Sequence, residues 1–177
     1  MPVTINGSAG VTTNTGAVYN GLQTDTAKAS TSGTSIDFTS IPNWVKRITV
    51  MFNGVSTNGT SVVQIQLGDS GGIETTGYLG AVGRTGTGAA GLNNSAGFVL
   101  EDSAVATVVR HGSIVISLLN SSTNTWSAFG VIGRSDSANV YMQGGTKPLS
   151  DVLTQVRVTT VNGTDTFDAG SINIIYE

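Results

Sequence analysis

Residues 46–52 read Lys-Arg-Ile-Thr-Val-Met-Phe, and this stretch decides the fold class. Successive side chains of an extended strand point to opposite faces, so Ile48, Val50 and Phe52 share one face and the residues between them share the other. An alternation of period two indicates a strand, whereas a helix repeats its apolar positions every three to four residues. The stretch therefore predicts a β-strand with one face in the core.

The segment that follows has the composition of a hairpin. Asn-Gly pairs stand at 53–54 and 58–59, and both residue types tolerate the positive φ of tight turns. Residues 63–67 then alternate apolar side chains with glutamines, which predicts a second half-buried strand.

Short apolar runs bounded by Gly, Asn, Asp and Ser continue to the C-terminus. Further strands are expected at residues 35–38, 97–100, 105–109, 113–119, 126–132, 139–143, 155–161 and 171–176. The run from Ile114 to Leu119 is apolar on both faces, so it is expected to be buried on both sides. About ten short strands, with turns every ~8 to 12 residues, predict an all-β fold, an antiparallel β-sandwich of jelly-roll-like type.

The chain divides into two parts. Residues 1–26 carry mostly small polar side chains with isolated apolar ones and are expected to form an N-terminal arm or connecting segment, followed by the sandwich domain at 27–177. Within the domain, residues 78–97 are rich in glycine and are expected to form an extended loop at one end. Residues 149–153 are the only plausible helical turn.

Composition excludes several function classes. Only 11% of residues are charged and the net charge is -3, so the chain lacks the basic stripe that nucleic-acid binding needs. The absence of cysteine removes disulfides, thiolate catalysis and zinc ribbons. No apolar run has the length of a membrane span and no signal peptide is recognisable, so membrane insertion is not expected.

No set of residues resembles a catalytic or cofactor site. Glycines 86, 88 and 91 have dinucleotide-fingerprint spacing, but a strand pattern follows them where that motif needs a helix. His111, the only histidine, is expected in a solvated turn. Glu101 and Asp102 are adjacent and point to opposite faces of an extended chain, so they do not form a glycosidase pair. No enzyme activity and no cofactor are expected.

Two further acidic groups are candidate sites. The carboxylates of Asp69 and Glu74 form a possible pair, and residues 162–168 contain oxygens that could bind calcium. The second segment lacks the length and acid density of a dedicated calcium loop, so turn-capping is the preferred interpretation and no metal is expected.

Aromatic side chains are the candidates for binding carbohydrate, because sugar faces stack on rings. Trp44 and Trp126 lie in or beside strand patterns and are expected in the core. Tyr78, Arg84 and Tyr141 are the proposed receptor-binding residues, with Tyr78 expected at the surface of the glycine-rich loop.

The two ends of the sandwich region carry a resemblance to a known family. The segments concerned are 28–38, 41–59, 72–78 and 156–174, which include Ile41-Pro42-Asn43-Trp44 and Asn162-Gly163-Thr164-Asp165. They resemble the C-terminal domain of bacteriophage tail-fibre and related tail proteins, over most of the chain from about residue 27.

This resemblance implies a structural protein of the virion, at a tail-fibre tip or in a receptor-binding module for viral attachment. It also implies a homotrimer, contacts with other virion proteins through the arm, and a host-surface glycan as ligand. The alternative is a capsid decoration (cement) protein or a minor tail protein with no receptor role.

Overall fold

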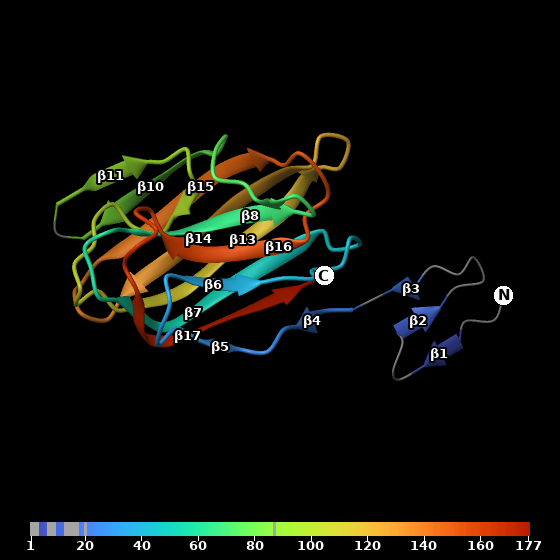
Figure 1. The fold of residues 1–177 in the computed structure, drawn as a ribbon, viewed down its shortest axis with the longest axis horizontal. Helices are drawn as coiled ribbons and strands as arrows, with labels where there is room; N and C mark the ends of the chain where they lie inside the picture. The colour runs from blue at the N-terminus through green and yellow to red at the C-terminus, as the bar shows by residue number, and fades with distance from the viewer. Residues whose placement is uncertain (1–3, 7–9, 13–17, 20, 87) are drawn as a thin grey trace.

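The computed structural model shows a β-sandwich built from two antiparallel sheets that pack together (Figure 1). The structure describes residues 4–6, 10–12, 18–19, 21–86 and 88–177, and it describes side chains from residue 21 onward apart from residue 87. The described residues contain no helix. The predicted all-β antiparallel sandwich is therefore confirmed.

The larger sheet has nine strands. Its strands in spatial order are β11 (Ala90–Asn93), β10 (Leu79–Thr85), β15 (Val140–Pro148), β14 (Thr125–Arg134), β13 (Arg110–Asn120), β7 (Arg47–Thr57), β17 (Phe167–Tyr176) and β4 (Gln23–Thr24), with β5 (Lys28–Ala29) also paired to β17. The sheet thus includes residues from both ends of the chain.

The smaller sheet has five strands. They are β12 (Phe98–Val99), β8 (Val63–Asp69), β16 (Gln155–Thr160) and β6 (Ser35–Phe38) in spatial order, with β9 (Gly72–Ile73) paired to β8. A third sheet near the N-terminus contains β1 (Thr4–Asn6), β2 (Gly10–Thr12) and β3 (Val18–Tyr19) (Figure 1). Most of the arm expected over residues 1–26 lies outside the described side chains.

The core lies between the two large sheets. Ile48, Val50 and Phe52 of β7 are all buried, which confirms the face assigned to them from the alternation. They meet the inward side chains of β8, where Ile65 and Leu67 are fully buried. These strands form because period-two alternation gives each sheet one apolar face, and the two faces cover each other.

Two expected elements are absent from the described chain and one is replaced. Residues 105–109 form a loop rather than a strand, with a turn closed by the Val108 N–H and the Val105 carbonyl. Residues 149–153 form no helical turn. The glycine-rich stretch 78–97, expected as a loop, contains the β10–β11 hairpin instead, because the backbone of β10 hydrogen-bonds to both β11 and β15.

The burial expected on both sides of residues 114–119 is also wrong. Ile114 and Ile116 are fully buried, but Val115 is only half-buried and Leu119 is 64% exposed. The reason is that a sandwich has two layers, so no third layer of the described residues covers the outer face of β13. No described helix is long and apolar enough to cross a membrane.

Candidate functional site

Tyr78 lies in the core, so its expected surface position is wrong. Its side chain is 1% exposed and its hydroxyl accepts a hydrogen bond from the Leu67 N–H at 2.7 Å. The hydroxyl also donates to the Glu74 carbonyl at 3.0 Å, and the ring packs edge-on against Phe98. Burial raises the pKa of Tyr78 well above its usual value. The ring is not available to stack on a sugar.

The other two proposed receptor-binding residues lie away from Tyr78, Arg84 at the far end of β10 and Tyr141 at the start of β15. Arg84 and Tyr141 face each other across β10 and β15, but Tyr141 is only 1% exposed. Arg84 pairs with Asp102, with the closest nitrogen and oxygen 3.4 Å apart. Six residues of extended chain separate Tyr78 from Arg84, roughly 20 Å. The three candidates therefore do not form one site.

The positions of the two tryptophans agree better with the expected burial in the core. Trp126 is 2% exposed and belongs to the core, as predicted. Trp44 is partly buried, and its ring centroid lies 5.9 Å from that of Tyr176.

His111 adopts an arrangement unsuited to activating a serine. Its Nδ1 accepts a hydrogen bond from the Gly54 N–H at 3.2 Å, and its Nε2 lies 3.2 Å from the Ser135 hydroxyl. A neutral imidazole that accepts at Nδ1 carries its proton on Nε2. Nε2 then donates to Ser135 and cannot take the proton of that hydroxyl, which a general base would have to do.

The carboxylates form ion pairs and hydrogen bonds that hold neighbouring segments together. Glu101 forms a fully buried ion pair with Arg110, and Asp102 pairs with Arg84. Hydrogen bonds, first from Ser150, lower the pKa of Asp69. Burial of Glu74 opposes its ionisation, but Lys147 and Ser150 outweigh it and the net pKa is lowered. A glycosidase acid needs a raised pKa, so the lowered pKa values of Asp69 and Glu74 fit hydrogen-bonded structural groups.

Residues 162–168 also cap a turn, as preferred from the sequence. The carboxylate of Asp165 accepts hydrogen bonds from the Ser61 N–H and the Asn162 amide. The side-chain oxygen Oδ1 of Asn162 in turn accepts hydrogen bonds from the backbone N–H groups of Thr164 and Asp165. Among the described residues, no group of three or more His, Cys, Asp or Glu side chains is arranged to hold a metal ion.

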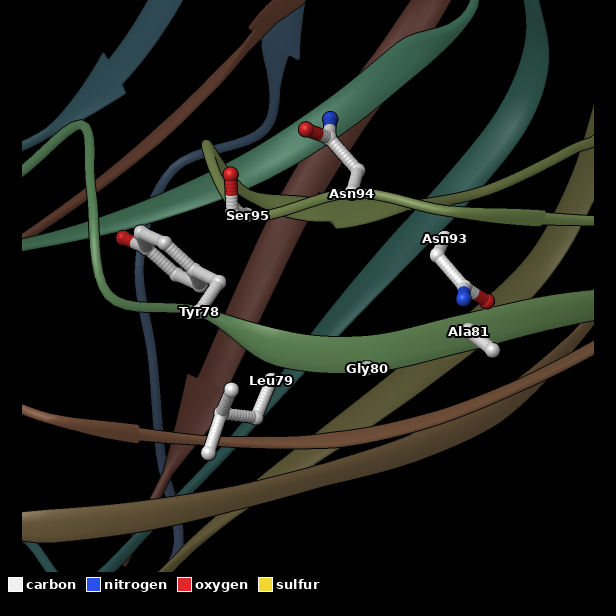
Figure 2. Close-up of a pocket in the computed structure, with 7 residues that line it drawn as sticks. All are labelled: Tyr78, Leu79, Gly80, Ala81, Asn93, Asn94 and Ser95. Carbon is white, nitrogen blue, oxygen red and sulfur yellow. The ribbon is translucent and has the colours of Figure 1, made fainter.

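A hollow of about 630 Å³ opens at the start of the β10–β11 hairpin (Figure 2). The two strands pair from Ala81 and Asn93 onward, and the Tyr78 N–H donates to the Ser95 carbonyl at 3.1 Å. The two segments do not pair between these positions, and the hollow lies there. Figure 2 shows Leu79 and Tyr78 pointing to opposite sides of the strand, with Leu79 71% exposed.

A polar groove of about 310 Å³ lies on the outer face of the five-stranded sheet. Gln64, Thr159 and Ser35 stand opposite one another across β8, β16 and β6, and Gln66 and Arg157 form the next row. These side chains point outward because they alternate with core residues of the same strands. The remaining lining residues are Thr34, Thr75, Ala96, Thr160, Val161, Asn162 and Gly163.

The amides of the groove are held in fixed positions by the segment 94–97. Asn94 Nδ2 donates to the side-chain oxygen Oε1 of Gln64 at 2.9 Å, and Gln66 Nε2 donates to the backbone carbonyl of Ala96 at 2.8 Å. Asn94 lines the hollow and Gln64 lines the groove. The segment therefore forms a ridge between the two depressions.

The only charged side chain lining the groove among the described residues is Arg157, and it is neutralised. Its Nε and Nη2 donate to the two carboxylate oxygens of Asp37 at 2.7 and 2.8 Å. This bidentate pair raises the pKa of Arg157, first through the hydrogen bonds that Arg157 donates to Asp37. The groove consequently offers hydrogen-bonding groups without a net charge.

Sequence reasoning missed the groove. The alternation predicted that Gln64 and Gln66 face away from the core, and outward positions filled by amides and hydroxyls rather than charges were the available signal. That signal does not show which outward residues a distant segment will cover.

No family model, curated protein or solved structure matches the chain.

Proposed function

We propose that this protein is a non-catalytic attachment module of a bacteriophage tail that binds a neutral glycan on the host surface. The observation that carries the proposal is the uncharged, hydrogen-bonding groove on the five-stranded sheet, with the hollow beside it. The phage assignment rests on the resemblance of the sequence to tail-fibre C-terminal domains, which also predicts a homotrimer attached to other virion proteins through its arm.

The chemistry of the groove matches a saccharide. Sugars present several hydroxyls that both donate and accept hydrogen bonds, and amides, hydroxyls and a guanidinium provide the complementary groups. Gln64 and Gln66 are only 2% and 5% exposed and form the floor of the groove beneath residues 94–97. The groups open to a ligand are those of the exposed residues Thr34, Thr75 and Asn162 and of the half-buried residues Ser35 and Arg157. Because Asp37 neutralises Arg157, a neutral glycan suits the groove better than an acidic one.

The affinity of one groove is expected to be low. The lining contains no aromatic side chain among its described residues, so the stacking energy that many sugar sites use is missing. Several linked copies would compensate, since a second site engages at a high effective concentration once the first is bound.

Blocking the groove tests the proposal. Thr75 is exposed at the groove, and Thr107 is an exposed threonine outside its lining, so Thr75→Trp and Thr107→Trp form a matched pair. The purified chain should compete with phage adsorption and bind surface polysaccharide extracted from the host bacterium. We expect Thr75→Trp to weaken polysaccharide binding at least ~10-fold and Thr107→Trp to leave it unchanged. Equal binding by both variants would contradict the proposal.

The position in the virion is tested separately by immunogold labelling of intact particles with an antibody against this chain. Label at the tail tip supports attachment. Label over the head would overturn it and would favour a capsid decoration protein.

A further inference from the structure

Four large apolar side chains are exposed next to one another on the outer face of the nine-stranded sheet. Phe129 and Val131 belong to β14, and Val140 and Met142 belong to the neighbouring strand β15. Their exposed fractions are 64%, 47%, 40% and 53%, in the same order. We refer to these residues, together with Gly83, Gly133 and Gly144, as the outer patch.

The face around the outer patch carries no Asp, Glu, Lys or Arg at the outward positions of β10, β13, β14 and β15, all of which the structure describes. The charged residues of these strands are Arg84, Arg110, Arg134 and Lys147. Each occupies a position whose side chain faces inward. Exposed sheet faces and edges normally carry charges that prevent association. Here the alternation directs every one of them inward.

The three glycines of the outer patch are not required by the fold of the chain itself. Among the described residues, a Cβ atom at Gly83 would meet nothing within 4 Å, and at Gly133 or Gly144 it would meet one backbone oxygen at 4.0 Å. None of the three has a positive φ. Glycine inside a strand costs roughly 0.5–1 kcal/mol relative to alanine, and it often marks a site where another backbone or a ligand approaches closely.

Glycines on the inward face of the same strands behave differently. A Cβ at Gly130 would lie 2.3 Å from the Ser113 carbonyl oxygen, and one at Gly145 would lie 2.7 Å from that of Leu79. Packing inside the sandwich therefore requires the inward glycines, whereas nothing inside the chain requires the outward ones.

Each outward glycine stands directly opposite a protruding apolar side chain. Gly144 pairs with Phe129, and Gly133 pairs with Val140 across β14 and β15. Gly83 pairs with Met142 across β10 and β15. In the outer patch, protruding apolar side chains therefore alternate with depressions at the glycines. The same patch on a second copy presents apolar side chains that can fill these depressions.

We infer that the outer patch packs against the same face of another copy of this chain. Symmetric assemblies bring identical surfaces together around their axis, and two uncharged faces meet without repulsion. The four side chains expose roughly 400 Å² if each large apolar side chain offers on the order of 200 Å². That is about half of the ~800 Å² per partner of a standard interface, and neighbouring Ser and Thr provide a polar rim.

This inference rests on the proposed attachment module and assigns a two-fold contact between copies, which pairs like faces as a dimer and is distinct from the trimer that the resemblance predicts. The groove lies on the outer face of the other sheet, so association through the outer patch leaves it open.

Light scattering coupled to size-exclusion chromatography tests the inference over a range of micromolar concentrations. The variants are Gly83→Thr, which fills a depression, Val131→Lys, which adds a charge, and Val105→Lys, a control at a valine 50% exposed outside the outer patch. We expect a mass above one chain for the unmodified protein and for Val105→Lys. Gly83→Thr and Val131→Lys should raise the dissociation constant at least ~10-fold.

A thermal melt accompanies each variant. Gly83→Thr should keep or raise the melting temperature, because threonine favours a strand and has room at this position. Retained stability with lost association supports an interface and excludes misfolding. A monomeric mass of the unmodified protein at every concentration would overturn the inference, as would association that persists in both patch variants.

Polysaccharide binding by the same samples separates the two proposals. Groove binding by a protein that does not associate overturns only the interface. Association without any groove binding overturns only the proposed function.

Discussion

A fully buried ion pair joins four segments of the chain: the loop at Glu101 and strands β7, β8 and β13. Arg110 Nε and Nη2 donate to the two carboxylate oxygens of Glu101 at 2.6 and 2.7 Å. Glu101 also accepts the backbone N–H of Val63 at 2.8 Å, and Arg110 reaches the Val55 carbonyl at 3.4 Å. The pair thus connects β13 of one sheet with β8 of the other. Removing one partner would leave an uncompensated charge in the core.

Glu101→Ala should therefore lower the free energy of unfolding by about 3–5 kcal/mol, since both the Arg110 charge and the Val63 N–H lose their partner. Urea denaturation measures the change. The double variant Glu101→Leu with Arg110→Met is the control, and it should recover most of the loss because it removes both charges. A loss below about 1 kcal/mol for Glu101→Ala would contradict the assigned role.

Acid should destabilise the protein through Asp136. The hydrogen bond from Arg134, helped by the Val109 N–H, lowers the pKa of Asp136 from 3.8 to about 2. A lowered pKa means that the carboxylate stabilises the fold above pH 3.8, and that this contribution is lost as the pH falls toward about 2. Asp69, Glu74 and Asp165 also have lowered pKa values and act in the same direction.

Thermal denaturation between neutral pH and pH 2 measures this effect. The melting temperature should fall on acidification, and Asp136→Asn should fall less steeply than the unmodified protein. Identical slopes for the two proteins would show that the Arg134–Asp136 pair does not contribute.

The strands differ in the number of neighbouring strands to which they are hydrogen-bonded. β13 lies between β14 and β7, paired along almost its whole length on both sides. β11 is an edge strand of four residues with β10 as its partner. Amide hydrogen exchange should therefore be slowest in β13 and fastest in β11, because edge hydrogen bonds open locally without global unfolding.

Exchange measured residue by residue checks this order. Fast exchange throughout β10 as well would indicate that the hairpin opens as a unit. Equal protection of β11 and β13 in a protein shown to be monomeric would contradict the edge position of β11. Protection of β11 that appears only on association would instead indicate that another copy covers this edge.

The β10–β11 hairpin also shows a limit of prediction from sequence. Its apolar pattern is thin, since glycine occupies 80, 83 and 91, and such a stretch scores as a loop. Pairing along seven positions with β15 makes it a strand, and β15 lies more than fifty residues away in the chain. Local propensity does not include that partner.

For the whole molecule, the two sheets present outer faces of different chemistry. The five-stranded sheet carries amides, hydroxyls and a neutralised arginine, and the nine-stranded sheet carries apolar side chains and glycines. The two proposals use this division, since they assign the glycan to one face and the contact with another copy to the other.

Separate faces predict separable effects. Val131→Lys should leave the affinity of a single groove for polysaccharide unchanged, while it reduces competition with phage adsorption by ~10²-fold or more through lost avidity. Calorimetry measures the first quantity and an adsorption assay the second. A matching loss in both would indicate that the groove depends on association.

The sequence by itself determined the fold class and the inward faces of strands such as β7 and β8, because period-two alternation is a local property of the chain. It also assigned Trp126 to the core and residues 162–168 to a capped turn. The tertiary structure alone decided that Tyr78 and Tyr141 are buried, that residues 94–97 cover the glutamines of β8, and that outward glycines face apolar side chains on neighbouring strands. These features depend on pairings between segments far apart in the chain, and the energy of such contacts is not encoded in any single stretch of sequence.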